Sequence, residues 1–400
     1  MSLNNATNKS TVKVIEVIRS HGEVSRRLIA AETGLSTPSI TRLVNELVDA
    51  NVLSVQDSIT VDGAGPGRPA SVVRLNPLHC CAIGVDVGEH VIQFALGNMG
   101  GDIQFTSSLP TNADDSNDAT FSNIVTGIKS IYELFQSKSE GAAIPLRAIT
   151  VGVPGTVDPL TSKVVKAPMI NGWTDYDLKK QLELQIPDVE IRIVNDINAA
   201  AIGESAYGVA KGYDNFVFAS IRRGIGAGIF IDGKLYQGSS GFAGEMGKMV
   251  FDSSFEFSAE AGTGHFESTC GEDVLLRQAI ERGVELEQAD SGRPRLRSLA
   301  SAAASGNTEA TTILKSFLTT YGLTLANITS LLDPSIIVIG GELHPIMDMT
   351  VEQLTKTISR LVPSPPKIVG SALEDRAVLQ GAFYQAHKDA CGTLLNRQTV

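Results

Sequence analysis

Apolar residues near the N-terminus recur at helical spacing in three successive segments. Around positions 14–18 they predict a first helix that ends at His21. Ser25 can cap a second helix, and Ser36 or Thr37 can cap a third. The third helix has four apolar residues on one face: Ile40, Leu43, Val44 and Leu47. This order of helix, short turn and helix predicts a helix-turn-helix.

The opposite face of the third helix carries the polar residues Ser39, Arg42 and Asn45. Hydroxyl, guanidinium and amide groups can hydrogen-bond to base edges in a major groove or to phosphates. An ordinary solvated helix face has the same composition, so this feature alone does not decide between the two. With Ser36 and Thr37 at the start of the helix, these residues are the expected contacts with DNA.

A hairpin after the third helix favours DNA binding. Residues 52–53 and 72–75 can form two strands, joined by the rigid and basic segment Gly65-Pro66-Gly67-Arg68-Pro69. Such a hairpin is typical of a wing, and Arg68 can contact a minor groove or a phosphate. Three helices and a wing favour a winged helix-turn-helix that binds DNA over one that docks a protein. We assign it residues 1–76.

From about residue 80, short apolar runs alternate with helical segments. Five of these runs predict buried strands, at 82–88, 149–153, 191–194, 216–221 and 336–341. The alternation indicates an α/β protein, and two such halves form two lobes with a cleft between them. The expected limits are 77–197 for the first lobe, completed by 375–400, and 198–374 for the second.

Composition narrows the class further. A hydrophobic share of 42% supports substantial cores. There is no apolar run of membrane-spanning length, no signal peptide and no CxxC pair among the four cysteines, so we expect a cytoplasmic protein without membrane contact. The net charge of −11 is uneven, with +1 over residues 1–76 and −12 over the remainder. An acidic body repels DNA, so DNA contact is expected in the N-terminal domain alone.

The segment 194–204 contains an Asn-Asp pair, followed by a helix rich in small residues. Placed behind a helix-turn-helix, it resembles the sugar-phosphorylating core of the ROK family (repressors, open reading frames and kinases). The resemblance extends from about residue 80 to the end, and the Gly-Arg-Pro of the wing resembles ROK-type regulators. It implies a two-lobed actin-like ATPase (ribonuclease H-like) core.

The resemblance also implies a set of ligand-binding residues. In ROK kinases the Asp of the Asn-Asp pair takes the proton of a sugar hydroxyl, so Asp196 holds the vestigial position of the kinase base. Asp196 can also cap the following helix, and both roles can hold at once. The residues that match the family's sugar contacts, the last two on weaker grounds, are Asn195, Asp196, Glu245, Glu267, Gly155 and Asn171.

Two turns that bind phosphate in the family are altered. The first has Asp-x-Gly-Gly-Thr-Lys in the family and Asp86-Val87-Gly88-Glu89-His90-Val91 in this chain, so a carboxylate would face an incoming phosphate. The second has Gly-Thr-Gly-Ile-Gly in the family and begins with Arg222-Arg223 here, although arginine can itself bind phosphate. These changes argue against ATP chemistry, and no cofactor is expected.

The family's structural zinc site is altered too. Lys248 replaces its histidine, and Ser258, Glu260 and His265 replace its three cysteines, so no metal is predicted. A weak site at Glu260 and His265 is less favoured than a surface loop ordered by phenylalanine packing. Lys248 has two open interpretations: it selects an anionic effector, such as a sugar phosphate or carboxylate, or it neutralises a nearby glutamate.

These observations predict a ligand-responsive, DNA-binding transcriptional regulator, a repressor without enzymatic activity. Its expected partners are a double-stranded DNA operator and a small-molecule effector (a sugar, a sugar phosphate or another metabolite). It is expected to be a homodimer or a dimer of dimers. The alternative is an active ATP-dependent sugar kinase that carries a DNA-binding domain. A scaffold that binds neither ligand nor operator is least favoured, because the pocket acids are retained.

Overall fold

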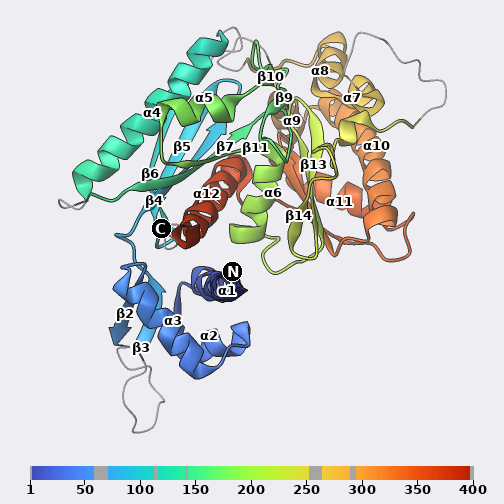
Figure 1. Cartoon of the computed structure of the whole chain (residues 1–400). Coiled ribbons are helices and arrows are strands. Elements are labelled where there is room, and N and C mark those ends of the chain that lie inside the picture. Colours follow the sequence, from blue (N-terminus) through green and yellow to red (C-terminus); the bar gives the residue numbers. More distant parts are fainter. Residues whose placement is uncertain are drawn as a thin grey trace.

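The computed structural model describes residues 2–57, 71–111, 116–139, 143–251, 264–288 and 294–396. Its N-terminal domain lies beside a larger, two-lobed body (Figure 1). Three helices and a three-stranded sheet of order β1-β3-β2 form this domain. Their bounds are α1 (Ser2–His21), β1 (Glu23–Ser25), α2 (Arg26–Thr33), α3 (Thr37–Asp49), β2 (Leu53–Asp57) and β3 (Ser71–Leu75).

Local capping explains where the N-terminal helices begin and end. The Ser25 hydroxyl accepts a hydrogen bond from the Leu28 N–H at 3.2 Å, and Gly34 ends α2 with φ of 71°. Of the two candidate caps for α3, Ser36 fills the role, and it accepts a hydrogen bond from the Ser39 N–H at 3.4 Å. The four predicted apolar residues of α3 are buried. The predicted helix-turn-helix is therefore confirmed.

The two predicted wing strands pair antiparallel, from Leu53 opposite Leu75 to Asp57 opposite Ser71. The wing tip, with Arg68, lies outside the described residues. Strand β1 was not predicted, because three residues are too short to show a period of two. It pairs with β3 and joins the start of α2 to the wing.

The first lobe contains a five-stranded sheet of order β11-β7-β4-β5-β6. Strands β4, β5 and β6 are consecutive and antiparallel, whereas β7 and β11 run parallel to β4. Their bounds are β4 (Cys81–Val87), β5 (Val91–Asn98), β6 (Ile103–Pro110), β7 (Leu146–Val153) and β11 (Glu190–Asn195).

The second lobe repeats this topology with the order β14-β13-β12-β15-β16. Its first three strands are antiparallel, and its last two run parallel to the first. Their bounds are β12 (Phe216–Ile221), β13 (Ile225–Ile231), β14 (Lys234–Tyr236), β15 (Ile336–Gly341) and β16 (Lys367–Gly370). Two sheets of the same order agree with the two-lobed, ribonuclease H-like fold.

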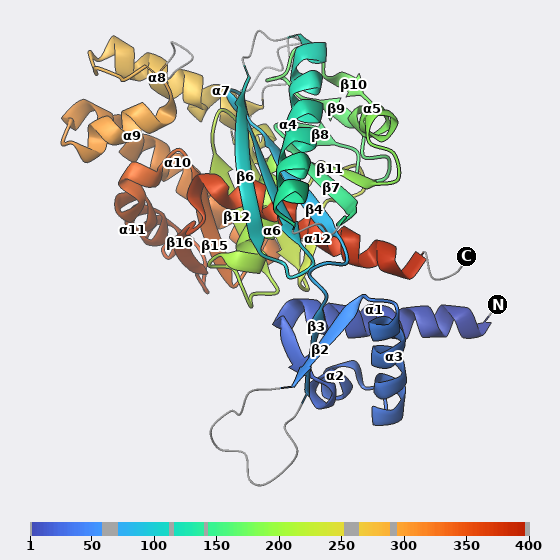
Figure 2. The ribbon, with the colours of Figure 1, turned by 90° about the vertical axis from the view of Figure 1, so that its left-hand side faces the viewer.

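Further helices and a small sheet lie around the two central sheets (Figures 1 and 2). The first lobe adds α4 (Asn117–Lys138), β8 (Thr156–Val157), β9 (Val164–Lys166), β10 (Thr174–Tyr176) and α5 (Leu178–Gln185). The second lobe adds η1 (Met246–Lys248), α7 (His265–Cys270), α8 (Glu272–Glu281), α9 (Leu296–Ala304), α10 (Thr308–Leu332), η2 (His344–Ile346), α11 (Met347–Ile358) and η3 (Glu374–Arg376).

Helices α6 (Asp196–Tyr207) and α12 (Ala377–Asn396) lie between the two sheets (Figure 1). They pack closely because glycines meet at their crossing: a Cβ added at Gly381 would lie 1.7 Å from the Ala199 carbonyl oxygen. Helix α12 also packs on the first sheet, where Gly84 of β4 lies against the backbone of Phe383. The predicted lobe limits fall beside these helices and stay predictions.

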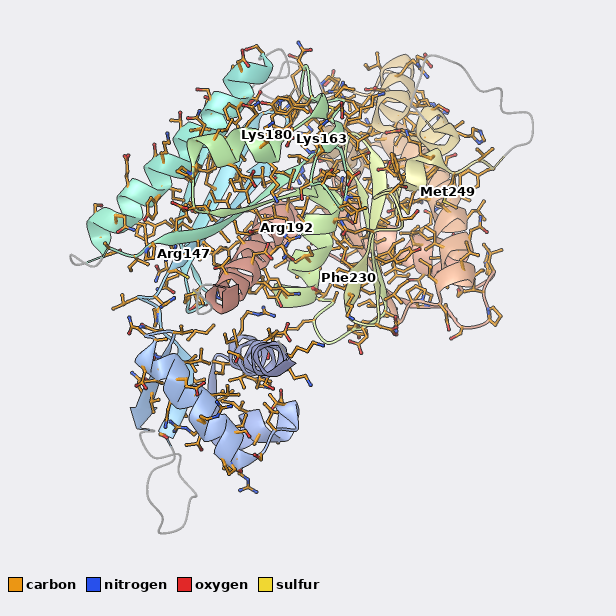
Figure 3. All side chains as sticks on the ribbon, viewed as in Figure 1. Arg147, Lys163, Lys180, Arg192, Phe230 and Met249 are labelled. Carbon is orange, nitrogen blue, oxygen red and sulfur yellow. The ribbon has the colours of Figure 1, made fainter. Side chains whose placement is uncertain are left out.

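An ion pair adds a polar link between the first sheet and α12. Arg192 of β11 (labelled in Figure 3) donates from Nη2 to Oδ1 of Asp389 on α12 at 3.0 Å. The hydrogen bond to this carboxylate raises the pKa of Arg192. Helix α12 is therefore held on the first lobe by a charged contact as well as by close packing.

The N-terminal domain packs on the body through α1 and α12, and Figure 2 shows the two helices side by side. One buried cluster contains Val14 and Ile18 of α1 together with Ala386 and Ala390 of α12. The guanidinium of Arg19 lies 4.8 Å from the centre of the Tyr384 ring, in a cation–π contact. The same helix, α12, therefore contacts both the first-lobe sheet and the N-terminal domain. Among the described helices, none is long and apolar enough to cross a membrane.

Candidate functional site

A cleft of about 1150 Å³ lies between the two lobes. The first lobe lines it with the turn after β4, the turn after β7 and the end of β11. The second lobe lines it with the β12–β13 turn, η1 and α7. This volume exceeds what a single sugar ring needs. The cleft can therefore hold a small-molecule ligand between the two lobes.

The structure brings most of the predicted ligand residues together at this cleft. Six of the seven predicted effector-binding residues line it: Gly155, Asn195, Asp196, Glu245, Lys248 and Glu267. They come from segments that are far apart along the chain. The cleft can therefore present several carboxylates and an amide to one ligand.

Asn171 is the exception, because it is exposed and is not among the residues that line the cleft. It occupies the tip of a tight turn, in which the Ala167 N–H donates to the Trp173 carbonyl oxygen at 2.9 Å. Ile170 and Trp173 on either side of this tip are buried in the first lobe. Burial of these apolar neighbours leaves Asn171 facing away from the core, so the structure does not place it with the other residues.

Asn195 and Asp196 are held at the junction of β11 and α6. The Asn195 Oδ1 accepts a hydrogen bond from the Asn198 N–H at 3.0 Å, so Asn195 is the N-cap of α6. The expectation that Asp196 caps the helix is wrong, because Asp196 is already its first residue. The Asn195 Nδ2 donates to the Gly155 carbonyl oxygen at 3.0 Å and to Asp196 Oδ1 at 3.1 Å. These bonds orient the carboxylate of Asp196.

The carboxylate of Asp196 is placed to accept hydrogen bonds from a ligand. Its Oδ1 also accepts from the Ile197 N–H at 2.9 Å. Burial raises the pKa of Asp196, and the positive charge of Arg222 opposes this shift. A half-buried carboxylate with one oxygen fixed by local donors is suited to bind a hydroxyl group of a sugar.

Glu245 and Glu267 face the cleft from the second lobe, next to η1 and in α7. Burial raises the pKa of both carboxyls, and the charge of Lys248 opposes the shift in each case. Close packing of α7 on η1 fixes their spacing, because a Cβ at Gly264 would lie 2.1 Å from the Gly247 carbonyl oxygen. Lys248 therefore provides positive charge for two glutamates at once.

The two altered phosphate turns meet across the cleft. Glu89 follows β4 of the first lobe, and Arg223 lies between β12 and β13 of the second. Their side chains form an ion pair, with Arg223 Nη1 2.5 Å from Glu89 Oε1. The residues in these turns therefore bind one another, and a nucleotide phosphate would have to displace this ion pair to reach them.

Asp86, at the end of β4, belongs to the same region. Burial raises its pKa to about 7, Arg222 opposes the shift, and the charges of Asp196 and Asp375 add to it. Arg222 thus acts electrostatically on both Asp86 and Asp196. Arginine in this turn supplies the positive charge that two buried carboxylates need.

A second group of ion pairs at this cleft was not predicted. Arg295 and Arg297 both pair with Glu342, at 3.0 and 3.4 Å, and Arg297 also pairs with Asp375 at 2.8 Å. All four residues line the cleft. The segment Arg295-Leu296-Arg297 was a visible signal, but its acidic partners lie tens of residues away and could not be matched to it.

No group of three or more His, Cys, Asp and Glu side chains within the described ranges is arranged to hold a metal ion. Ser258 and Glu260 lie outside those ranges. The Nδ1 of His265 accepts a hydrogen bond from the Phe251 N–H at 3.0 Å, so this nitrogen has a structural role. Phe251 also packs edge-on against Phe266, with ring centres 5.5 Å apart. The sequence predicts packing by Phe251, Phe255, Phe257 and Phe266 in this segment, and of these Phe255 and Phe257 lie outside the described residues.

The predicted DNA-contacting residues lie along one side of α3. Ser36, Thr37, Arg42 and Asn45 are exposed, and Ser39 is half-exposed. The Ser36 and Ser39 hydroxyls are hydrogen-bonded at 2.9 Å, and Arg42 pairs with Glu46 at 3.1 Å. The α3 surface can therefore present hydroxyl, guanidinium and amide groups to a groove.

Arg26 adds a contact that the sequence did not reveal. Its Nη1 donates to the Ser71 hydroxyl at 2.9 Å, and its Nη2 donates to Asn45 Oδ1 at 3.4 Å. Arg26 begins α2, Ser71 begins the wing strand β3, and Asn45 lies on α3. One guanidinium therefore links the expected recognition helix to the base of the wing.

Replacing Arg42 with alanine should weaken binding to a specific operator by about 1 kcal/mol, or roughly fivefold, the lower end for a base contact. The low value is expected because Glu46 already holds part of the guanidinium. Fluorescence anisotropy on DNA selected from random sequences measures the change. Arg282→Ala, in the second lobe, is the control and should leave the affinity unchanged. Equal losses on selected and random DNA would contradict a base-reading role.

Known families match both parts of the chain. The model of the ROK family matches residues 82–389, and a winged helix-turn-helix DNA-binding model matches residues 7–54. A solved ROK family transcriptional regulator, a homologue of the Escherichia coli MLC protein, has a TM-score of 0.80 at 23% identity. It covers 98% of both chains. This structure supports the predicted fold over nearly the whole length.

The sequence relatives include both regulators and kinases, and they differ in how much of this chain they cover. The xylose repressor of Bacillus subtilis (strain 168) is 27% identical over 88% of this chain and 86% of its own. The N-acetylglucosamine repressor of Escherichia coli O6:H1 is 26% identical over 94% and 91%. A glucokinase of Halalkalibacterium halodurans is 30% identical, but it covers 65% of this chain and 79% of its own. The similarity to repressors thus extends over more of the chain than the similarity to the kinase.

Proposed function

The chain belongs to the ROK family as a DNA-binding transcriptional regulator, and we propose that a small polyhydroxylated effector bound in the cleft releases it from its operator. It would therefore act as a repressor. The observation that carries the proposal is the state of the cleft, where ligand-binding carboxylates remain and the phosphate turns are joined by Glu89 and Arg223. Phosphoryl transfer needs a positioned nucleotide phosphate, which would have to displace this ion pair. The protein is a regulator and not a kinase.

The effector site is proposed to comprise Gly155, Asn195, Asp196, Glu245, Lys248 and Glu267. Asp196, Glu245 and Glu267 offer three carboxylates, whose negative charge Lys248 and Arg222 oppose. Carboxylates accept hydrogen bonds from several hydroxyl groups of one ring. We therefore favour a neutral sugar as the effector. Asn171 is not included, because it does not line the cleft.

An anionic effector is the second candidate, because Lys248 lines the cleft. A sugar phosphate or sugar acid would place its negative charge beside this ammonium group. The negative charges of the three carboxylates would also repel it. The balance of these charges favours the neutral ligand.

Isothermal titration calorimetry of the full chain distinguishes the two effector classes. Suitable probes are N-acetyl-D-glucosamine, D-glucose and D-xylose, with the 6-phosphates of the first two and xylonate as charged counterparts. We expect one neutral sugar to bind at least ~10-fold more tightly than its charged counterpart, because one tenfold step corresponds to roughly 1.4 kcal/mol of charge repulsion. The same sugar should lower affinity for the selected operator in the anisotropy assay.

Three other results would contradict parts of this proposal. Tighter binding of a charged counterpart would reject the neutral effector and support the anionic one. Tight binding of ATP with magnesium would contradict the interpretation that the ion pair between the phosphate turns disfavours a nucleotide. A panel of sugars that neither binds nor changes operator affinity would count against a sugar-class effector.

The DNA-binding mode is proposed from α3 and the wing. Ser36, Thr37, Ser39, Arg42, Asn45 and Arg68 would contact the operator, with α3 in the major groove. We propose a homodimer or dimer of dimers in the cytoplasm, with two winged helices on half-sites one helical turn apart, about 10 base pairs. A monomer mass in light scattering of the DNA-bound protein would contradict this arrangement.

A further inference from the structure

We propose that Glu89 and Arg223 are positioning residues, which hold the two lobes at the separation that effector binding requires. They do so by an ion pair across the cleft. This role rests on the effector site proposed above, whereas the separation of the lobes can be measured without an effector.

The position of the pair supports this role. Glu89 lies in the β4–β5 turn of the first lobe, and Arg223 lies in the β12–β13 turn of the second, 134 residues further along the chain. The two sheets have the same topology, so these are equivalent turns of the two lobes. A contact of 2.5 Å between equivalent turns joins the lobes directly at the edge of the cleft.

The carboxylate of Glu89 is less exposed than that of an ordinary surface ion pair. The Glu89 side chain is 18% exposed and that of Arg223 is 39% exposed. The second carboxylate oxygen of Glu89 lies 3.7 Å from Nε2 of its neighbour His90. A mostly buried carboxylate depends on its partner, because removal of one member leaves a charge with less solvation.

The neighbouring Arg222 provides a second electrostatic attraction across the cleft. Arg222 belongs to the second lobe and opposes the burial-induced rise in the pKa of Asp86, near the end of β4, and of Asp196, the first residue of α6. The β12–β13 turn thus directs positive charge toward acids near the first-lobe sheet. Glu89 and Arg223 supply the direct contact within this wider attraction.

The effector residues explain why lobe separation matters. Asn195 and Asp196 lie where β11 meets α6, whereas Glu245 and Glu267 belong to the second lobe. One ligand can contact both groups only at a limited range of separations. Because it joins the two lobes, the ion pair can set this range before the effector arrives. Such preorganisation lowers the cost of binding.

The expected effect is moderate, because Arg223 is partly exposed and solvent screens the pair. Loss of either partner should weaken effector binding by ~3- to 10-fold, because the lobes are then no longer held at the separation that the effector needs.

The lobe separation can be measured by double electron–electron resonance on the full chain. Spin labels would be placed at Leu184→Cys on α5 and Ile280→Cys on α8, which are exposed positions in the two lobes. A Cys270→Ser background removes the partly exposed native thiol, and the other three cysteines are buried. We expect a narrow distance distribution that Glu89→Gln and Arg223→Gln each broaden and lengthen. The exchanged pair, Glu89→Arg with Arg223→Glu, should restore it.

A matched control uses an ion pair within one lobe. Arg282 and Glu309 form a contact of 3.3 Å in the second lobe, so Arg282→Gln should leave the distribution unchanged. If a single variant does not fold, wild-type protein in 1 M salt should show a smaller broadening of the same kind, because salt screens the exposed part of the Arg223 guanidinium but weakens a partly buried pair less. Wild-type distributions in both single variants and in high salt would overturn the proposal.

Calorimetry with the neutral sugar that binds best then measures the effect on affinity. We expect both single variants to bind it ~3- to 10-fold more weakly and the exchanged pair to recover most of this loss. If no sugar binds, the sugar-effector proposal fails while the distance measurement still tests the ion pair. Normal affinity in variants with a widened cleft would overturn the positioning role.

Discussion

Replacing Gly381 with alanine should destabilise the protein by about 3 kcal/mol or more, at the upper end of the cost of overpacking. The added Cβ would lie 1.7 Å from the Ala199 carbonyl oxygen and 2.7 Å from the Gly203 backbone nitrogen. Both neighbours are backbone atoms of α6, so no side-chain rotation can relieve the overlap. The helices would have to separate, and α12 also packs on the first sheet and on α1.

Thermal unfolding followed by circular dichroism measures this effect. Gly392→Ala is the matched control, because it lies in the same helix and its added Cβ would have no neighbouring atom within 4 Å. That substitution should stabilise the helix by about 0.5–1 kcal/mol, the usual gain of alanine over glycine. Equal melting temperatures for the two variants would contradict the close crossing of α6 and α12.

Replacing Asp196 with asparagine should lower effector affinity by ~10- to 150-fold, since a hydrogen bond to a charged group contributes about 1.5–3 kcal/mol. Asparagine keeps the size of the side chain and can still accept a hydrogen bond from the Ile197 N–H. The fold and the operator affinity without effector should therefore remain as in the wild type. Calorimetry with the binding sugar and anisotropy with the operator measure the two quantities.

Asn171→Ala is the control for this experiment. Asn171 matches the family's pocket by sequence but lies at an exposed turn outside the cleft, so its removal should leave effector affinity unchanged. A strong loss in Asn171→Ala, with little change in Asp196→Asn, would mean that the effector binds elsewhere than in the proposed site.

The two sites lie at opposite ends of a continuous set of packed helices. Asp196 begins α6, which crosses α12, and α12 reaches α1 of the N-terminal domain, where Arg19 lies over Tyr384. A change in the angle between the lobes therefore has a physical route to the winged helix. Coupling requires that the effector bind two such arrangements with different affinity.

Much of the N-terminal domain could be predicted from short stretches of sequence. Ser25 and Gly34 bound α2, and Ser36 caps α3, because a cap bonds to residues three positions away. The buried face of α3 follows from helical spacing alone. The same local reasoning misplaced the cap of α6, since Asn195 and Asp196 are both good caps and one residue decides between them.

The sequence by itself determined the local elements, the order of the buried strands and the loss of the family's phosphate pattern, because each depends on residues close together in the chain. Tertiary structure decided which distant side chains meet. It pairs Glu89 with Arg223 and Arg295 with Glu342, and it leaves Asn171 out of the cleft lining. Such contacts depend on how two lobes pack, and packing combines many weak interactions that no short segment contains.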